Sequence, residues 1–118
     1  MNHLSIGSQG ERVARLFCIR KGWQIRDTNW RAGRGELDIV AQDKDTTIFI
    51  EVKSRTSHTF GFPEEALTPH KQGMLRKTIS AYCTRFNVHN FRVDVICVHI
   101  HNKKARIEHL RDIELLPN

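Results

Sequence analysis

The chain has 118 residues, a net charge of +6 and 27% charged residues. This length predicts one domain, residues 1–118, with a core that is stable without cross-links. The 39% of hydrophobic residues excludes a largely disordered chain. The sequence has no apolar run of about 18 residues and no signal-peptide pattern at its start. We therefore expect neither membrane insertion nor secretion.

The three cysteines are widely spaced and include no CxxC pair: Cys18, Cys83 and Cys97. This usage favours buried or half-buried thiols in a reducing compartment, so we expect a cytoplasmic protein. The pI near 9.7 is consistent with a polyanionic partner such as nucleic acid.

The first predicted element is a helix over residues 8–21. Ser8 and Glu11 have the spacing of a capping box, and Gly22 follows as a stop signal. Within the helix, helical spacing links Val13, Leu16, Phe17 and Arg20. Alternating side chains predict a short strand over residues 23–29.

A loop, a pair of strands with the turn between them, and a second loop follow. Residues 31–35 have the composition of a flexible basic loop. Residues 36–42 and 46–53 predict two strands around a polar turn at residues 43–45. Residues 54–62 predict a polar loop.

The second half of the chain predicts one more helix and two strands. Thr68 and Pro69 are an N-cap and a first helical residue, and the helix extends to about Phe86. Its apolar stripe is formed by Leu75, Ile79, Tyr82 and Phe86. Residues 91–100 predict a long central strand and residues 105–110 an edge strand. The fold class is therefore α/β, in the order α-β-β-β-α-β with a last strand, as a mixed sheet with flanking helices.

The hairpin of residues 36–53 has a predictable register. A closure of two or four residues at its turn opposes Ile39 to Ile50 and Leu37 to Val52. Both pairs are apolar, so they form one consistent face, which supports this register.

The opposite face of the hairpin carries like charges. The same register places Asp38 directly opposite Glu51, and Glu36 opposite Lys53. Opposed carboxylates destabilise a sheet, and their Cβ atoms would be about 4.5–5.5 Å apart. Such a pair needs compensating positive charge, from Lys53 and from a divalent cation.

Two carboxylates in this arrangement suit Mg²⁺, with Mn²⁺ as the alternative. Asp38, Glu51 and the backbone carbonyl of Val52 are the predicted ligands. The ion would polarise a phosphodiester, and Lys53 would position the attacking water or stabilise charge on the phosphate. The alternative is a solvated sheet face on which the lysine forms an ordinary salt bridge with the acids.

These residues resemble a known family. Residues 35–41 (GELDIVA) and 49–55 (FIEVKSR) resemble the PD-(D/E)xK nuclease signature. The wider pattern is similar to the YraN-type family of predicted bacterial endonucleases, distant relatives of archaeal Holliday junction resolvases. It also includes residues 91–95 (FRVDV), Gly10, Glu11, Ala14, Gly22, Asn29, Phe60, Gly61 and Lys71.

The resemblance implies a restriction-endonuclease-like core that cleaves DNA, with branched DNA as the favoured substrate. It implies that Asp38 and Glu51 bind metal, that Lys53 assists catalysis, and that Glu11 supports the site from the first helix. For Glu11 a purely structural capping role stays open. A junction has two-fold symmetry, so cutting both of its strands would suit a homodimer.

Basic residues flank the acids. Arg31, Arg34 and Arg55 lie on predicted loops and suit phosphate binding, and we favour this role for Arg55. Lys71 lies in the first turn of the second helix, where the helix dipole disfavours a cation, which suggests a nearby anion. A solvated basic face is the alternative for all four residues.

Other polar residues have structural interpretations. We expect Glu36 to pair with Lys53 or Arg34 rather than to bind metal. Asp94 and Arg92 lie on one face of an apolar strand and predict a buried ion pair.

Aromatic and imidazole side chains give weaker signals. Trp30 and Phe60 lie near polar loops and are candidates for stacking on unpaired bases, whereas Trp23 fits the core. His99 and His101 form an HxH pair for which we identify no further metal ligands.

Two other functions remain open from the sequence. One is a nucleic-acid-binding module on a nuclease scaffold with little or no turnover. The other is a structural or adaptor protein in which the acids stabilise the fold.

Overall fold

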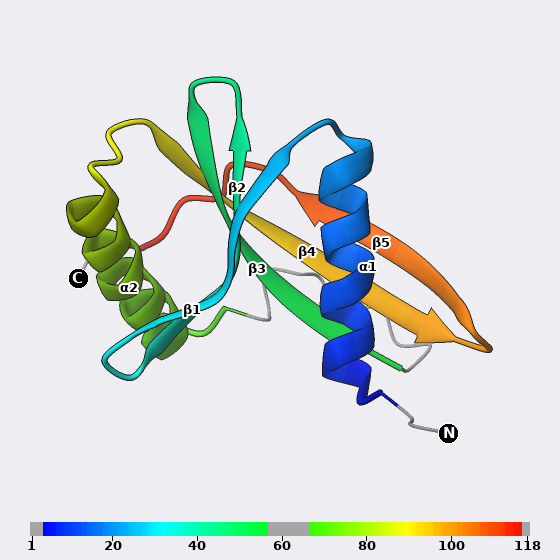
Figure 1. The fold of residues 1–118 in the computed structure, drawn as a ribbon. Coiled ribbons are helices and arrows are strands. Elements are labelled where there is room, and N and C mark those ends of the chain that lie inside the picture. The colour runs from blue at the N-terminus through cyan, green and yellow to red at the C-terminus, as the bar shows by residue number, and fades with distance from the viewer. Residues whose placement is uncertain (1–3, 57–66, 117–118) are drawn as a thin grey trace.

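The computed structural model describes residues 4–56 and 67–116, which form a five-stranded sheet with two helices (Figure 1). The elements in chain order are α1 (Ile6–Arg20), β1 (Gln24–Ala32), β2 (Gly35–Asp43), β3 (Thr46–Arg55), α2 (Pro69–Phe86), β4 (Phe91–His101) and β5 (Lys104–Leu110). The strands lie in the order β1-β2-β3-β4-β5. β3 and β4 are parallel, and the other neighbours are antiparallel. The predicted element order and mixed sheet are confirmed for the described residues.

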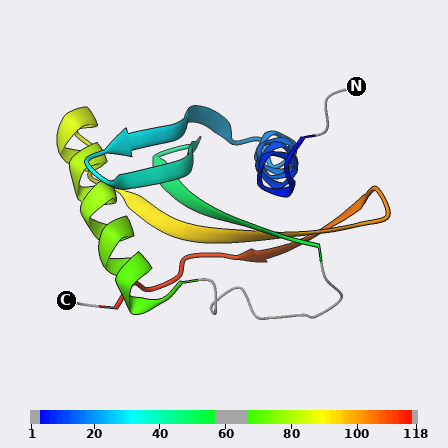
Figure 2. The ribbon, with the colours of Figure 1, turned by 90° about the horizontal axis from the view of Figure 1, so that it is seen from below.

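The two helices cover different faces of the sheet, at opposite ends (Figures 1 and 2). Ile48 and Ile50 of β3 pack in a cluster with Ala14 and Cys18 of α1. Phe49, which lies between them in the strand, packs instead in the cluster that contains α2. This alternation follows from strand geometry, because successive side chains point to opposite faces.

The start of α1 differs from the predicted capping box. The N-cap is Ser5, whose side chain accepts a hydrogen bond of 3.1 Å from the amide of Ser8. The helix therefore begins one turn earlier than Ser8, and Glu11 has no capping role. Leu16 also lies outside the core, with 53% of its surface exposed. Small residues form the buried face of α1: Gly10, Ala14 and Cys18.

The boundaries of α2 agree with the sequence. Thr68 is the N-cap and accepts a hydrogen bond of 3.2 Å from the amide of Lys71. Asn87 ends the helix in a left-handed conformation, with φ of 56°. The predicted apolar stripe is buried except for Phe86, which is 37% exposed.

The segment that was predicted as a basic loop is mostly strand. β1 continues to Ala32, and the turn to β2 contains two residues, Gly33 and Arg34. Gly33 has a φ of 58°, which glycine adopts without strain. Pairing with β2 extends β1 beyond its predicted end at Asn29. Local composition missed this extension because cross-strand pairing stabilises it.

The hairpin register is confirmed for its first half and is wrong for its second half. The paired residues run from Asp43 and Thr46 at the turn to Ile39 and Ile50. Beyond Ile39 the two strands part, because β2 continues beside β1 whereas β3 continues beside β4. Asp38 is therefore not a ladder partner of Glu51. The side chain of Asp38 instead accepts a hydrogen bond of 2.8 Å from the amide of Val52.

The parting of the strands also divides the apolar face that was predicted for the hairpin. Ile39 lies in the core cluster on the α1 side, and Val52 packs against it. Leu37 lies in the cluster on the α2 side. β2 therefore bends at Asp38, between two buried residues that a regular strand would place on one face.

β4 carries the buried ion pair that its sequence predicted. Asp94 is fully buried, and its carboxylate lies 3.0 Å from Nε of Arg92. His109 of β5 and the amide of Asp112 also hydrogen-bond to Asp94, at 2.8 Å and 2.9 Å. These bonds attach the C-terminal segment to the sheet.

Two further features agree with the sequence. Cys18 and Cys97 are buried free thiols, and Cys83 is a half-buried one. Of the two helices in the described part of the chain, neither has an apolar stretch long enough to cross a bilayer.

Gly10 sets how closely α1 approaches β3. A Cβ atom at this position would collide with the side chain of Ser54. We expect Gly10→Ala to force α1 away from β3 and to lower the free energy of unfolding by about 1–3 kcal/mol, as overpacking does. Gly7→Ala is the matched control, because its new Cβ would meet only Ser5, at 3.9 Å. Urea denaturation should show this control unchanged or stabilised; equal effects of the two substitutions would contradict the close approach.

Candidate metal centre

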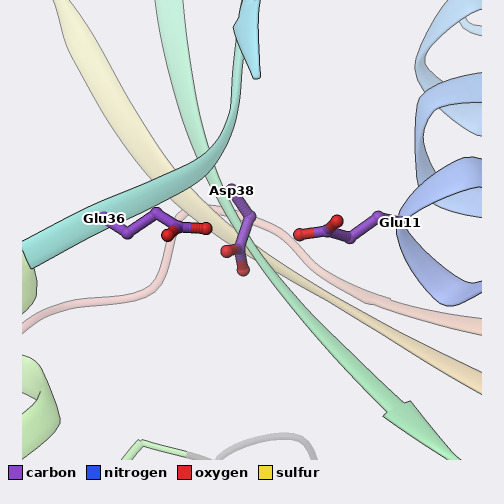
Figure 3. Close-up of side chains that lie close together, drawn as sticks. All are labelled: Glu11, Glu36 and Asp38. Carbon is purple, nitrogen blue, oxygen red and sulfur yellow. The ribbon is translucent and has the colours of Figure 1, made fainter. Parts of the chain in front are cut away.

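Three acidic side chains from two elements meet where β2 leaves β3 (Figure 3). Glu11 comes from α1, and Glu36 and Asp38 come from β2. Each contributes one carboxylate oxygen to a group in which these atoms lie within 4.8 Å of one another. In Figure 3, Glu11 and Glu36 point toward Asp38 from opposite sides. All three residues are half-buried.

Asn29 of β1 links two of these acids. Its side-chain amide donates hydrogen bonds of 3.0 Å to Glu11 and of 3.0 Å to Glu36. Asn29 has a φ of 52°, a left-handed conformation that asparagine tolerates better than most residues. The side chain of Asn29 therefore holds the acids of α1 and β2 at a fixed separation.

Glu51 and Lys53 of β3 lie on the same cavity as the three acids. This cavity has a volume of about 580 Å³. Its wall includes the first residues of α1, the three acids, Glu51, Val52 and Lys53. Asp38 and Glu51 therefore face one cavity although they are not ladder partners.

The electrostatics of the acids are those of crowded, partly dehydrated carboxylates. Burial raises the pKa of Asp38 to about 6, although the hydrogen bond from Val52 acts in the other direction. Burial, and then the charge of Asp38, raise the pKa of Glu51 to about 8. Without a cation, these two groups therefore retain protons far above the usual range of carboxyl groups.

Positive charge borders the acids on one side. The neighbouring Lys71 of α2 is the largest cause that lowers the pKa of Lys53, and burial adds to it. The charge of Lys71 in turn lowers the pKa of Glu51. Lysines from β3 and α2 are thus close enough to interact, and a bound anion would relieve their repulsion.

The predicted arginines occupy different places. Arg31 forms an ion pair of 2.9 Å with Glu36, and it replaces the predicted partners of Glu36, which were Lys53 and Arg34. Arg34 lines a neighbouring cavity together with Lys71. Arg55 ends β3, two residues beyond Lys53, and acts on the pKa of Lys53 as a nearby charge.

Glu36 is the site residue that sequence reasoning assigned away from the metal. Its signal was its position two residues before Asp38 in a strand, which places both side chains on one face. The ion pair with Arg31 does exist, but the carboxylate also belongs to the acidic group.

Several predicted site residues lie elsewhere. Trp30 is half-buried, and its ring lies 5.0 Å from that of Tyr82, so it packs in the core rather than in a binding surface. Trp23 is buried, as predicted. His99 lies 3.3 Å from Glu108 of β5. Phe60 and most of the predicted loop at residues 54–62 lie outside the described residues.

Comparison with known proteins identifies relatives along most of the chain. The model of the uncharacterised protein family UPF0102 matches residues 10–98. The chain belongs to the UPF0102 family. A UPF0102 protein of Natranaerobius thermophilus is 43% identical over 117 residues, which cover 95% of this chain and 98% of the relative. One from Beutenbergia cavernae is 40% identical over 112 residues, 92% of this chain and 95% of the relative.

The part of the chain that matches the UPF0102 family contains the whole candidate centre. Residues 10–98 extend from Gly10, next to Glu11, to the end part of β4. All four acids, Lys53 and Lys71 lie within it. β5 and the C-terminal segment that Asp94 holds lie beyond it.

The raised pKa values predict that stability depends on pH. Between the ordinary carboxyl pKa near 4 and about 8, the folded protein binds more protons than the unfolded chain, so stability falls as pH rises. After allowance for solvent screening, we expect the metal-free protein to lose about 1–3 kcal/mol across this range. Thermal melting in EDTA at pH 5 and pH 8 measures this loss.

Two comparisons isolate the contribution of these acids. The double variant Asp38→Asn, Glu51→Gln should not show this loss of stability between pH 5 and pH 8. It should therefore melt above wild type at pH 8. Mg²⁺ or Mn²⁺ should raise the midpoint of wild type at pH 8, because a ligand that binds only the folded state stabilises it. A double variant that melts below wild type at pH 8 in EDTA would contradict the electrostatic account.

Proposed function

We propose that this member of the UPF0102 family is a metal-dependent endonuclease that hydrolyses phosphodiester bonds in DNA, on a core of the restriction-endonuclease type. The observation that carries the proposal is the parting of β2 and β3 at Asp38. It opens a cavity in which acids from three elements and Lys53 meet. The sequence similarity to the PD-(D/E)xK signature selects Asp38, Glu51 and Lys53 independently.

The donor set fits a hard divalent cation. Carboxylate oxygens of Glu11, Glu36 and Asp38 lie within 4.8 Å of one another. Burial, and then the charge of Asp38, raise the pKa of the neighbouring Glu51. Such all-oxygen sets suit Mg²⁺ or Mn²⁺. Asp38, Glu51 and the Val52 carbonyl would hold the ion, and Glu11 and Glu36 would support its water shell. When bound, the ion supplies a Lewis acid for the phosphodiester and lowers the pKa of water.

Lys53 is a lysine that lines the same cavity as these acids. It follows Glu51 by two residues in β3 and therefore lies on the same side of the strand. The neighbouring Lys71 and burial hold the pKa of Lys53 below the usual value of a lysine. We assign Lys53 to stabilise charge that develops on the phosphate or to orient the attacking water.

The remaining basic residues would bind the flanking phosphates. Arg55 continues β3 away from the acids, and Lys71 and Arg34 border the site beside α2. Arg31 is held by Glu36, so it would contact phosphate only beside that ion pair. Arginine can contact a phosphate through two hydrogen bonds, which positions the strand without reading its sequence.

A cutting assay tests the proposal. The purified chain is incubated with linear, nicked and four-way-junction DNA in Mg²⁺, Mn²⁺ or EDTA. We expect cutting with metal and none with EDTA. If the protein binds DNA without cutting it under any condition, and this binding weakens steeply with salt, the chain is instead a nucleic-acid-binding module on a nuclease scaffold. Absence of both binding and cutting would contradict a role of the site in DNA chemistry.

A further inference from the structure

A second cavity adjoins the candidate metal centre on the side of α2. It has a volume of about 290 Å³ and shares Glu36 and Glu51 with the first cavity. An apolar floor is formed by Leu67, Met74 and Leu75. This cavity is small, at the lower limit of the volumes that ligand sites usually have.

The rim of the second cavity is basic. Arg34 comes from the turn between β1 and β2, and His70 and Lys71 come from the first turn of α2. All three side chains are exposed. An apolar floor below the two cations Arg34 and Lys71 matches a group with a flat apolar body and an attached phosphate.

The back wall of the cavity is closely packed. Gly35 of β2 approaches Thr78 of α2 so closely that an added Cβ would collide with the Thr78 side chain. The hydroxyl of Thr78 donates a hydrogen bond of 2.8 Å to the carbonyl of Met74. The close approach of Gly35 to Thr78 therefore brings β2 against α2 at this wall, and the hydrogen bond within α2 orients the Thr78 side chain.

We propose that this second cavity accepts one unpaired nucleotide of the DNA strand that is cut at the neighbouring acids. The base lies against Met74 and Leu75, and the rim cations contact its phosphate. A duplex is too wide for a cavity of this size, so a paired nucleotide must leave the base stack to enter it. Since unstacking costs less for a base that is already unpaired, the substrate class is DNA with a bulge, flap or other unpaired nucleotide at the cut site.

The inference rests on the proposed nuclease activity and is tested by selectivity. The kcat/KM is measured in Mn²⁺ for a paired duplex and for the same duplex with one bulged nucleotide at varied positions. Wild type should cut the bulged DNA at least about tenfold faster. Met74→Trp, which fills the cavity, should bring that ratio close to 1. Met74→Phe is a milder filling variant, should the larger ring prevent folding.

The control is Ser80→Trp, which adds the same ring to an exposed position of α2 outside this cavity. It should keep the ratio of wild type. Cutting by wild type without preference for the bulge, or a ratio that neither Met74 variant changes, would overturn the inference but leave the nuclease intact. Failure of wild type to cut any DNA would overturn the proposed function, and the inference with it.

Discussion

Asp38→Asn should lower the kcat of metal-dependent DNA cutting by about 1,000-fold or more. A catalytic metal contributes several kcal/mol to transition-state stabilisation, and each 1.4 kcal/mol corresponds to a factor of ten. The substitution removes the charge but retains a side-chain oxygen that can accept the hydrogen bond from Val52. The loss would therefore come from the metal site and not from the fold. Single-turnover cutting of labelled DNA in Mg²⁺ measures it.

Asp43→Asn is the matched control for this variant. Asp43 lies in the same strand, at the turn where it pairs with Thr46, and does not line either cavity of the candidate site. This variant should cut DNA at the rate of wild type. Glu51→Gln should behave like Asp38→Asn. Retention of cutting by both site variants would show that the acids are not the metal ligands.

Asp94→Ala should lower the free energy of unfolding by about 3–5 kcal/mol, the usual effect of removing one partner of a buried ion pair. The side chain of Arg92, only 10% exposed, would lose its carboxylate partner. His109 and the amide of Asp112 would also lose their acceptor. Because these groups attach the C-terminal segment, we expect it to become protease-sensitive as well. Urea denaturation measures the first effect and limited proteolysis the second.

The charge state of Asp94 adds a pH test. Burial would raise the pKa of Asp94, but the hydrogen bonds from His109, Arg92 and Asp112 outweigh burial and hold it below its usual range. The stability that Asp94 contributes is therefore present above pH 4 and is lost as pH falls through its folded pKa.

Asp45→Ala is the control for Asp94→Ala. Asp45 lies at an exposed turn, so this substitution should change the free energy of unfolding by less than about 0.5 kcal/mol. If Asp94→Ala lowered the free energy of unfolding by as little as this control, the bonds from Arg92, His109 and Asp112 would not stabilise the fold as we expect.

The sequence predicted those parts of the fold that local chemistry determines. Thr68 and Pro69 marked the start of α2, because an N-cap side chain and a proline act within one helical turn. The first half of the hairpin followed from the turn and from the apolar pair Ile39 and Ile50. Arg92 and Asp94 lie on one face of a single strand, so their pairing needed no tertiary information.

The features that the sequence did not predict depend on contacts between distant elements. The sequence predicts that the pairing of β2 with β3 continues past Ile39. In the structure, β2 continues beside β1 and β3 continues beside β4. Ser8 and Glu11 fitted a capping box, yet Ser5 is the N-cap, and Glu11 turns to the acids of β2. Both differences leave a carboxylate at the site, Asp38 in one case and Glu11 in the other. The local patterns had assigned these side chains to strand pairing and to helix capping.

Calorimetric titration of Mn²⁺ into EDTA-treated protein at pH 7 tests most directly that these acids form a metal centre. Glu51, with a pKa of about 8, is mostly protonated at this pH. Binding should therefore release up to about one proton per ion, measurable from the dependence of the heat on the ionisation enthalpy of the buffer. We predict this release for wild type and Asp43→Asn, and no binding for Asp38→Asn combined with Glu51→Gln. Absence of binding by wild type at millimolar Mn²⁺, or equal binding by the double variant, would contradict the metal centre.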